Sequence, residues 1–364
     1  MLTFSNPIDK EVGLNCTDGV EEEVTGDRMK LWSYIVRRLF LIIPTLIGVT
    51  VITFTISRLI PGDPIAVSLG PHASQEEIQS VRAKWGLDKP LHLQYVLYIR
   101  NLTRGDLGTS IHSKRPVLED LKDFLPATFE LTTASMFLSI VLGIPIGIIA
   151  AVKKNRWPDF VTRLYALAGV SMPVFWLGLL LLLIFYFKLG WLPGVGRLDP
   201  RLSPPTSITG LYLVDSLITA NWSVFFDALK HILLPAFSLS CVIMATISRM
   251  TRASMLEVMT ENYIKAARAR GLSERMVIYR HALKNSLIPV VTIIGVMYGV
   301  CLAGAVLTET IFSWPGLGRY AVKGITFLDF DAIMGFTLVA TLIYVFLNLI
   351  VDVAYLVIDP RIKF

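Results

Sequence analysis

The sequence predicts an all-α protein that crosses a membrane several times. Of its 364 residues, 54% are hydrophobic and only 17% are charged, and the mean hydropathy is +0.60. This composition is typical of an integral membrane protein rather than of a soluble core. Six apolar runs are long enough to cross a hydrocarbon layer, and Lys and Arg gather at alternate connections between them. The charge pattern predicts that both chain ends lie in the cytoplasm.

Composition also excludes several other classes of protein. The net charge of +6 could favour nucleic acid, but the basic residues flank apolar runs, where they orient a membrane protein. We therefore expect no nucleic-acid partner. The three cysteines, Cys16, Cys241 and Cys301, lie far apart, and two fall within predicted spans, so no disulfide framework is expected. The five histidines lack metal-ligand spacing, and no bound metal is expected.

The chain divides into four predicted parts. Residues 1–28 are acidic and without periodicity, which is typical of a disordered tail. Residues 29–60 contain the first transmembrane helix, and residues 61–127 form a polar external insert. Residues 128–364 form the transmembrane core, with a basic segment at 257–289.

The spans are predicted in order from the apolar runs. They cover residues 39–59, 129–152, 164–187, 235–250, 287–307 and 333–357. Arg37 and Arg38 place the start of the first span inside. Pro173 can kink the third span, and Pro235 marks the start of the fourth. The small residues of the fifth span, which suit close helix packing, are Gly295, Gly299, Ala303 and Gly304.

The external segments contain short helices and turns. In the insert, Ser74 and Glu77 form a capping box that begins a helix, which Gly86 ends. An amphipathic helix is expected at 91–102, and glycines mark a turn at 105–110. The insert could be a platform for an external binding protein or a lid over the external end of the pore. Further short helices are expected at 211–217 and 222–229, and a turn at 312–318.

The segment between the fourth and fifth spans has a helix, break, helix pattern. Thr260 can cap a first helix, and Glu261 lies where the positive end of the helix dipole favours an acid. Gly271 ends this helix as a left-handed cap, and Ser273 with Glu274 can begin the next. The excess of basic residues predicts a cytoplasmic location.

Within this segment, residues 263–272 read Tyr-Ile-Lys-Ala-Ala-Arg-Ala-Arg-Gly-Leu. This stretch resembles the "EAA" coupling loop of ABC-transporter permeases, in the form found in the dipeptide and oligopeptide branch, with Lys265 in place of the usual Glu. The Pro-Gly-Asp-Pro turn at 61–64, the stretch 85–91 and the Gly-Asp-Leu-Gly turn also resemble that branch. The resemblance covers about residues 30–364. It implies the six-span architecture of type I ABC importers, with a cytoplasmic coupling helix between spans 4 and 5.

The resemblance also implies a mechanical function in ATP-driven import of dipeptides or oligopeptides across the inner membrane of a prokaryote. ATP and Mg would be held by two partner ATPase subunits; the other partners would be a second permease in a heterodimer, an external solute-binding protein and membrane lipid. The residues expected to contact the ATPase are Tyr263, Lys265, Ala266, Ala267, Arg268, Arg270, Gly271, Leu272 and Arg275. Nickel chelates, glutathione and oligosaccharides remain alternative substrates.

No catalytic or nucleotide-binding motif is present in the sequence. The chain is therefore predicted not to be an enzyme and to bind no ATP itself. An ion-coupled secondary transporter, the alternative from another class, would need acids near the middle of the membrane. Glu130, Glu309 and Asp352 lie near span ends, so we expect them to be solvated or helix-capping. Arg58 and Lys188 are placed to reach the interface.

Overall fold

The computed structural model describes residues 16–59, 65, 69, 74–84, 86, 88–303 and 305–358. Within these residues the chain is helical and forms no β-strand apart from one isolated bridge between Thr109 and Pro116. The predicted turn at 61–64, most of the tail, Gly304 and the C-terminal residues 359–364 lie outside the described part. The prediction of an all-α membrane protein is confirmed.

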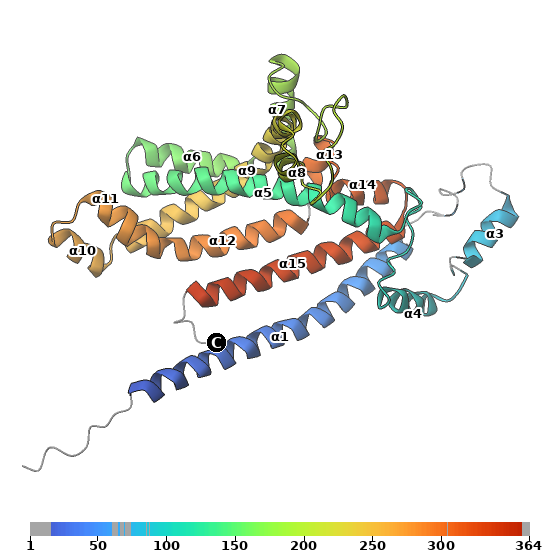
Figure 1. The fold of residues 1–364 in the computed structure, drawn as a ribbon, viewed down its shortest axis with the longest axis horizontal. Helices are drawn as coiled ribbons and strands as arrows, with labels where there is room; N and C mark the ends of the chain where they lie inside the picture. The colour runs from blue at the N-terminus through green and yellow to red at the C-terminus, as the bar shows by residue number, and fades with distance from the viewer. Residues whose placement is uncertain are drawn as a thin grey trace, which may run out of the picture.

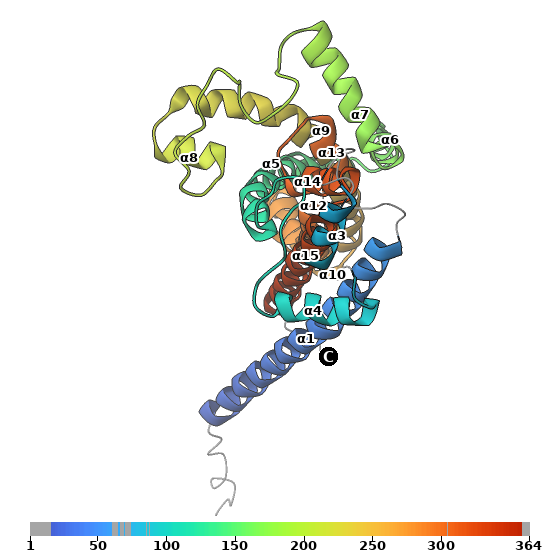
Figure 2. The same ribbon diagram turned by 90° about the vertical axis from the view of Figure 1, so that its right-hand side faces the viewer.

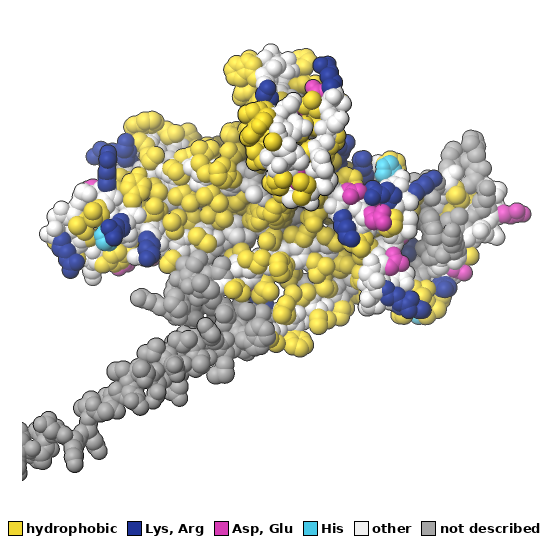
Figure 3. Space-filling model, viewed as in Figure 1, with side chains coloured by type: hydrophobic (Ala, Val, Ile, Leu, Met, Phe, Trp, Pro, Cys, Tyr) yellow, Lys and Arg dark blue, Asp and Glu magenta, His cyan; other side chains and the backbone are white. Residues whose placement is uncertain are grey.

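Five long helices form the body of the molecule. They are α1 (Cys16–Leu59), α5 (Val117–Val152), α9 (Trp222–Val258), α12 (Leu283–Ala303) and α15 (Phe330–Ile358). Helix α9 packs against both α5 and α12, α12 packs against α15, and α15 packs against α1 (Figure 1). Apolar side chains cover the middle of the bundle, and charged side chains gather at its two ends (Figure 3). This distribution fits a bundle whose middle lies in hydrocarbon.

In the described residues, five helices are long and apolar enough to cross a membrane, or six if one bent pair counts as a span. The bent pair is α6 (Trp157–Ser171) with α7 (Val174–Leu181) and its π-helical extension η1 (Leu182–Lys188). It replaces the single kinked span predicted at 164–187, because the two parts meet at 102°. Pro173 disfavours a helical conformation at Met172, which is extended at φ −84° and ψ 123°. Helix α7 and the long loop after it therefore project from the bundle (Figure 2).

Two other helix boundaries differ from the prediction. Helix α9 begins at Trp222, where the Asn221 side chain accepts from Val224 N, and it continues through Pro235. The expected separate helix at 222–229 and the break at Pro235 are therefore wrong. Pro235 is buried, and the long contact with α5 compensates for the backbone hydrogen bond that proline removes. Residues 16–28, which the sequence predicts to be disordered, are helical, since extending an existing helix costs little.

Glycines allow the long helices to approach closely. A Cβ on Gly147 would lie 2.7 Å from the Ser248 carbonyl oxygen of α9, and one on Gly143 would lie 3.2 Å from the Met244 oxygen. Of the small residues predicted to form a packing face, Gly295 faces α15, where a Cβ would overlap Val351. The prediction of close packing by the fifth span is confirmed at this position, but the α5–α9 contact was not predicted.

The two ends of the bundle carry the shorter helices. The elbow end, at the left of Figure 1, carries α10 (Asn262–Ala269) and α11 (Glu274–Met276). The far end carries the remaining short helices, which are α3 (Gln75–Lys84), α4 (Leu91–Leu102), α8 (Tyr212–Ile218), α13 (Val306–Ile311) and α14 (Leu317–Thr326). Helices α3, α4 and α8 were predicted. Helices α13 and α14 were not predicted, because the apolar run of the fifth span continues to 307 and the residues at 312–318 favour a turn.

Candidate coupling site

The elbow is the helix, break, helix segment that the sequence predicts. Gly271 follows α10 at φ +76°, and Ser273 Oγ accepts from Met276 N at the start of α11. Both local predictions are confirmed. Thr260 does not cap α10: its hydroxyl donates to the Glu257 oxygen, and Glu261 is the N-cap residue without a side-chain bond. Thr260 lies just after the end of α9, so its hydroxyl bonds back to a carbonyl oxygen in the last turn of that helix.

The second helix of the elbow is continuous with the fifth span, so the two are not separate as predicted. Residues Glu274–Ala303 form one run of 30 residues, with a π-helical turn, η2 (Val277–Ala282), between α11 and α12. Pro289 lies inside this helix. Val277, Ile278 and Ala282 are apolar and buried, so packing extends the helix beyond the membrane run.

Helix α10 is anchored to three long helices. Ile264 is fully buried and Ala267 is 7% exposed. Their cluster also contains residues of the elbow ends of α5, α9 and η2, with Leu272 partly buried against it; its other buried members are Ile148, Ala151, Met255, Val277, Ile278 and Ala282. In addition, Asn285 Nδ2 of α12 donates to the Tyr263 hydroxyl at 2.7 Å. Helix α10 is therefore fixed to the elbow ends of α5, α9 and α12.

The structure separates the predicted contact residues into two groups. Ala267 and Leu272 face the chain's own core, so Ala267 does not offer its small side chain to a partner, contrary to the prediction from the sequence. Arg268 forms a two-bond ion pair with Glu274 at 2.8 and 3.4 Å, which joins the two helices of the elbow. Both partners are at least one-third exposed, so the pair contributes less than about 1 kcal/mol.

The other predicted contact residues are exposed; they are Tyr263, Lys265, Ala266, Arg270, Gly271 and Arg275. Together with their exposed neighbours Ala269, Met276, Tyr279 and Arg280 they form a surface that we call the elbow surface. Met276 and Tyr279 are 40% and 60% exposed and were not singled out from the sequence. Their position in the sequence could have indicated them, because they lie on the opposite side of the helix from the buried apolar pair at 277 and 278. Exposed aromatic and apolar side chains among cations are typical of a protein docking surface.

The acids considered for ion coupling have structural roles. Glu309 is fully buried and accepts from Thr128 Oγ1 and from Arg319 N in the first turn of α14. Burial raises its pKa above the ordinary value, although the hydrogen bonds act in the opposite direction. Asp352 lies 2.8 Å from Arg38 of α1 in a partly exposed ion pair. The prediction that Glu309 caps a helix is therefore confirmed, and the alternative that its carboxylate is solvated is wrong.

Glu130 forms a buried ion pair at the far end. It lies 2.6 Å from Arg197 and also accepts from Leu213 N at the start of α8. The Arg197 guanidinium stacks 3.7 Å from the centre of the Tyr212 ring. These contacts fasten the loop after η1 and helix α8 to α5.

Replacing Arg197 with Met is expected to destabilise the protein by about 3–5 kcal/mol, because Glu130 would keep a buried charge without its cation. Unfolding in detergent with increasing denaturant would measure the change. Arg201→Met is the control, since Arg201 is an exposed residue of the same loop and should change the free energy of unfolding by less than about 0.5 kcal/mol. Equal effects of the two substitutions would contradict the role given to the buried pair.

Residues 143–364 match the family model of the binding-protein-dependent transport system inner membrane component, and residues 31–132 match that of its N-terminal part. The chain is 48% identical to the probable D,D-dipeptide transport system permease protein DdpB of Escherichia coli (strain K12), over 92% of this chain and 98% of that protein.

Other similar proteins are also permeases. The dipeptide transport system permease protein DppB of Alkalihalophilus pseudofirmus is 47% identical over 91% of this chain and 99% of its own. The glutathione transport system permease protein GsiC of Escherichia coli O6:H1 is 38% identical over the same shares. An inward-facing structure of the MetNI methionine ABC transporter aligns with a TM-score of 0.47 and 15% identity, over 65% of this chain and 94% of that one. The chain belongs to the family of binding-protein-dependent transport system inner membrane components.

Proposed function

We propose that this chain is the permease subunit of an ATP-driven importer of dipeptides or oligopeptides, and that its elbow receives the force of ATP hydrolysis. The observation that carries the proposal is the elbow surface, which is exposed on one side and anchored to three membrane helices on the other. A surface that only set the topology of the chain would not need this anchoring.

The charge distribution supports a cytoplasmic elbow. Lys153, Lys154 and Arg156 connect α5 to α6 at the end of the bundle that carries the elbow, so basic side chains gather there (Figure 3). Short loops rich in Lys and Arg remain in the cytoplasm. Helix α1 reaches the far end at Leu59, and α15 ends at Ile358 near the elbow end, which is consistent with both termini being cytoplasmic.

Dipeptides are the substrate class that the relatives favour. Permeases named for dipeptide transport reach 48% and 47% identity, whereas the glutathione permeases reach 38–40%. Glutathione is itself a peptide, so the alternatives differ in substrate detail rather than in mechanism. An ion-coupled transporter is less well supported, since Glu309, Glu130 and Asp352 are all engaged in caps or ion pairs.

The proposed cycle needs several partners. Two ATP-hydrolysing subunits would hold ATP and Mg, and each would bind the elbow of one of two permease subunits that form a heterodimer. Closure of the ATPases would move α10, and the cluster around Ile264 would carry this movement into α5, α9 and α12. At the other side of the membrane, the insert that contains α3 and α4 offers a platform for a solute-binding protein.

Photo-crosslinking tests the contact with the ATPase. A photoreactive amino acid replaces Tyr279, which is 60% exposed on the elbow surface, or Trp222, a matched control that is 57% exposed at the far end. The full transport system is expressed in membranes that also import labelled dialanine. We expect an adduct with the ATP-hydrolysing subunit from position 279 and none from position 222. An elbow that never reaches that subunit, or a reporter fusion showing it outside the cytoplasm, would refute the proposal.

A further inference from the structure

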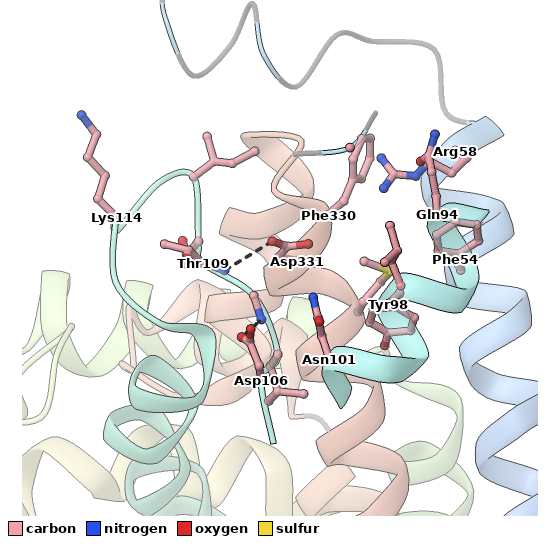
Figure 4. Close-up of a pocket in the computed structure, with 17 residues that line it drawn as sticks. Phe54, Arg58, Gln94, Tyr98, Asn101, Asp106, Thr109, Lys114, Phe330 and Asp331 are labelled. Carbon is pink, nitrogen blue, oxygen red and sulfur yellow. Dashed lines mark hydrogen bonds between the residues drawn. The ribbon is translucent and has the colours of Figure 1, made fainter. Parts of the chain in front are cut away.

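A cavity of about 560 Å³ with a mixed polar and apolar lining lies at the far end of the bundle. Its walls come from the ends of α1, α4 and α15 and from the loop that precedes α5 (Figure 4). Its volume is in the range of small-molecule sites, about 300–1,000 Å³. The cavity lies at the opposite end of the bundle from the elbow surface, so it is a separate site.

A cation with unused hydrogen-bond donors lines one side of the cavity. The Arg58 guanidinium lies 5.3 Å from the centre of the Phe54 ring and 5.9 Å from that of Phe330. Its Nε is buried without a hydrogen-bond partner. Aromatic rings attract the charge but do not accept the in-plane N–H groups, so Arg58 can still bind an anionic oxygen.

Two carboxylates line another side. Asp331 accepts a hydrogen bond from Thr109 N at 3.3 Å, and Asp106 accepts from Gly108 N at 2.9 Å. Gly108 has φ +85°, and a Cβ there would overlap the Asp331 carboxylate, so glycine allows the loop to approach this acid. Asp331 and Arg58 both line the cavity (Figure 4), yet no ion pair joins these two described residues.

A neutral donor also lines the cavity, which contains the further polar side chains of Gln94, Asn101 and Lys114. The Tyr98 hydroxyl is buried and has no hydrogen-bond partner. Burial, together with the nearby Asp331 charge, raises the pKa of Tyr98 to about 12, so the hydroxyl keeps its proton at neutral pH. A buried donor without a partner is unfavourable, and a bound ligand with an acceptor oxygen would satisfy it.

We propose that this cavity binds a small zwitterion, whose ammonium group contacts Asp331 and Asp106 and whose anionic group contacts Arg58 and the Tyr98 hydroxyl. A dipeptide with free termini has this chemistry, and so does the ethanolamine phosphate headgroup of a lipid. The dipeptide case rests on the proposed function and would make the cavity an external substrate site on the permease itself.

Binding measurements on the intact transport complex test the proposal. The complex, without its solute-binding protein, is placed in phosphatidylglycerol nanodiscs, and calorimetry measures the affinity for dialanine, N-acetyl-dialanine and dialanine amide. We expect each blocked ligand to bind the wild type at least about tenfold more weakly than dialanine, equivalent to about 1.4 kcal/mol. Arg58→Gln should lower the affinity for dialanine to the same degree, but it should not lower the affinity for dialanine amide further. Asp331→Asn should lower the affinity for dialanine but not lower the affinity for N-acetyl-dialanine further.

Controls separate the charge effects from unfolding. Arg100→Gln lies on α4 outside the cavity lining and should leave the affinities unchanged. Comparing the three ligands distinguishes a lost charge from misfolding. A misfolded variant would bind all three ligands equally weakly, whereas a variant that lacks one charge would lose affinity only for the ligands that carry the opposite charge. The proposal would be contradicted if Arg58→Gln and Asp331→Asn each lowered the affinities for all three ligands equally while Arg100→Gln left them unchanged.

A second experiment decides whether the zwitterion is a peptide or a lipid headgroup. If dialanine does not bind but phosphatidylethanolamine raises the Tm of the wild type and not of Arg58→Gln or Asp331→Asn, the ligand is a lipid headgroup and the proposed chemistry stands. If neither ligand binds in a charge-dependent way, the proposal is wrong. Uptake of dialanine by whole cells distinguishes the proposed function from the proposed site. If the wild type imports no dialanine, the proposed function is wrong. If Arg58→Gln and Asp331→Asn both import dialanine with an unchanged KM, only the peptide site is wrong.

Discussion

An Ala267→Asp substitution is expected to abolish uptake of labelled dialanine, while the chain still inserts in the membrane. Ala267 is 7% exposed in the cluster that anchors α10 to α5, α9 and η2. A carboxylate in this cluster would have no partner, and burying it would cost several kcal/mol. Helix α10 would therefore detach from the long helices, and movement of the ATPase would no longer reach them. Uptake assays and immunoblots of membrane fractions measure the two outcomes.

The neighbouring alanine provides the matched control. Ala266 is exposed on the other side of α10, so Ala266→Ser should leave uptake and thermal stability close to those of the wild type. Ala266→Asp should weaken retention of the ATPase without lowering the Tm of the permease, because the carboxylate stays in water. Full uptake by Ala267→Asp would show that anchoring of α10 is not required for transport.

This contrast shows where sequence reasoning ended. The coupling stretch, its approximate limits and the two capping residues Gly271 and Ser273 follow from local rules about backbone conformation and side-chain caps. Which of two adjacent alanines faces inward depends on the elements against which α10 packs, and a helix of 8 residues gives only a short amphipathic pattern. The inward face became clear only when Ile264 and Ala267 were found in the cluster with Met255 and Val277.

The errors at prolines have a common origin. Pro173 and Pro235 each lie next to apolar residues, and local rules treat both as helix breakers or kinks. Pro173 breaks its helix by 102°, whereas Pro235 lies inside the continuous α9. Helix α9 packs along α5 over much of its length, and this tertiary contact decides the outcome. Tertiary packing of this kind is not visible in the sequence.

The far end was the part least accessible to prediction. Hydropathy placed Glu130 and Glu309 near span ends, but their burial depends on segments that fold back over them. The loop that carries Arg197 covers Glu130, and the start of α14 covers Glu309. The cavity between Arg58 and Asp331 is likewise formed by residues more than two hundred positions apart in the sequence, and no local pattern joins them.

The second large effect is expected at Gly271. Replacing this residue with Pro should abolish uptake, because Gly271 has φ +76° and proline fixes φ near −65°. Proline would also remove the N–H that donates to the Arg268 oxygen at 2.9 Å. The turn between α10 and α11 could not form, and the elbow surface would lose its shape.

A graded series at the same position tests whether the backbone conformation is the cause. A Cβ on Gly271 would meet nothing within 4 Å, so side-chain size does not limit the substitution. Asn tolerates the left-handed conformation and should keep most of the uptake, whereas Ala should cost about 1–2 kcal/mol and reduce it further. We therefore expect the order Gly, Asn, Ala, Pro in both uptake and Tm. If Asn were as harmful as Pro while Ala was harmless, contact with a partner at this position, rather than the left-handed turn, would explain the requirement for glycine.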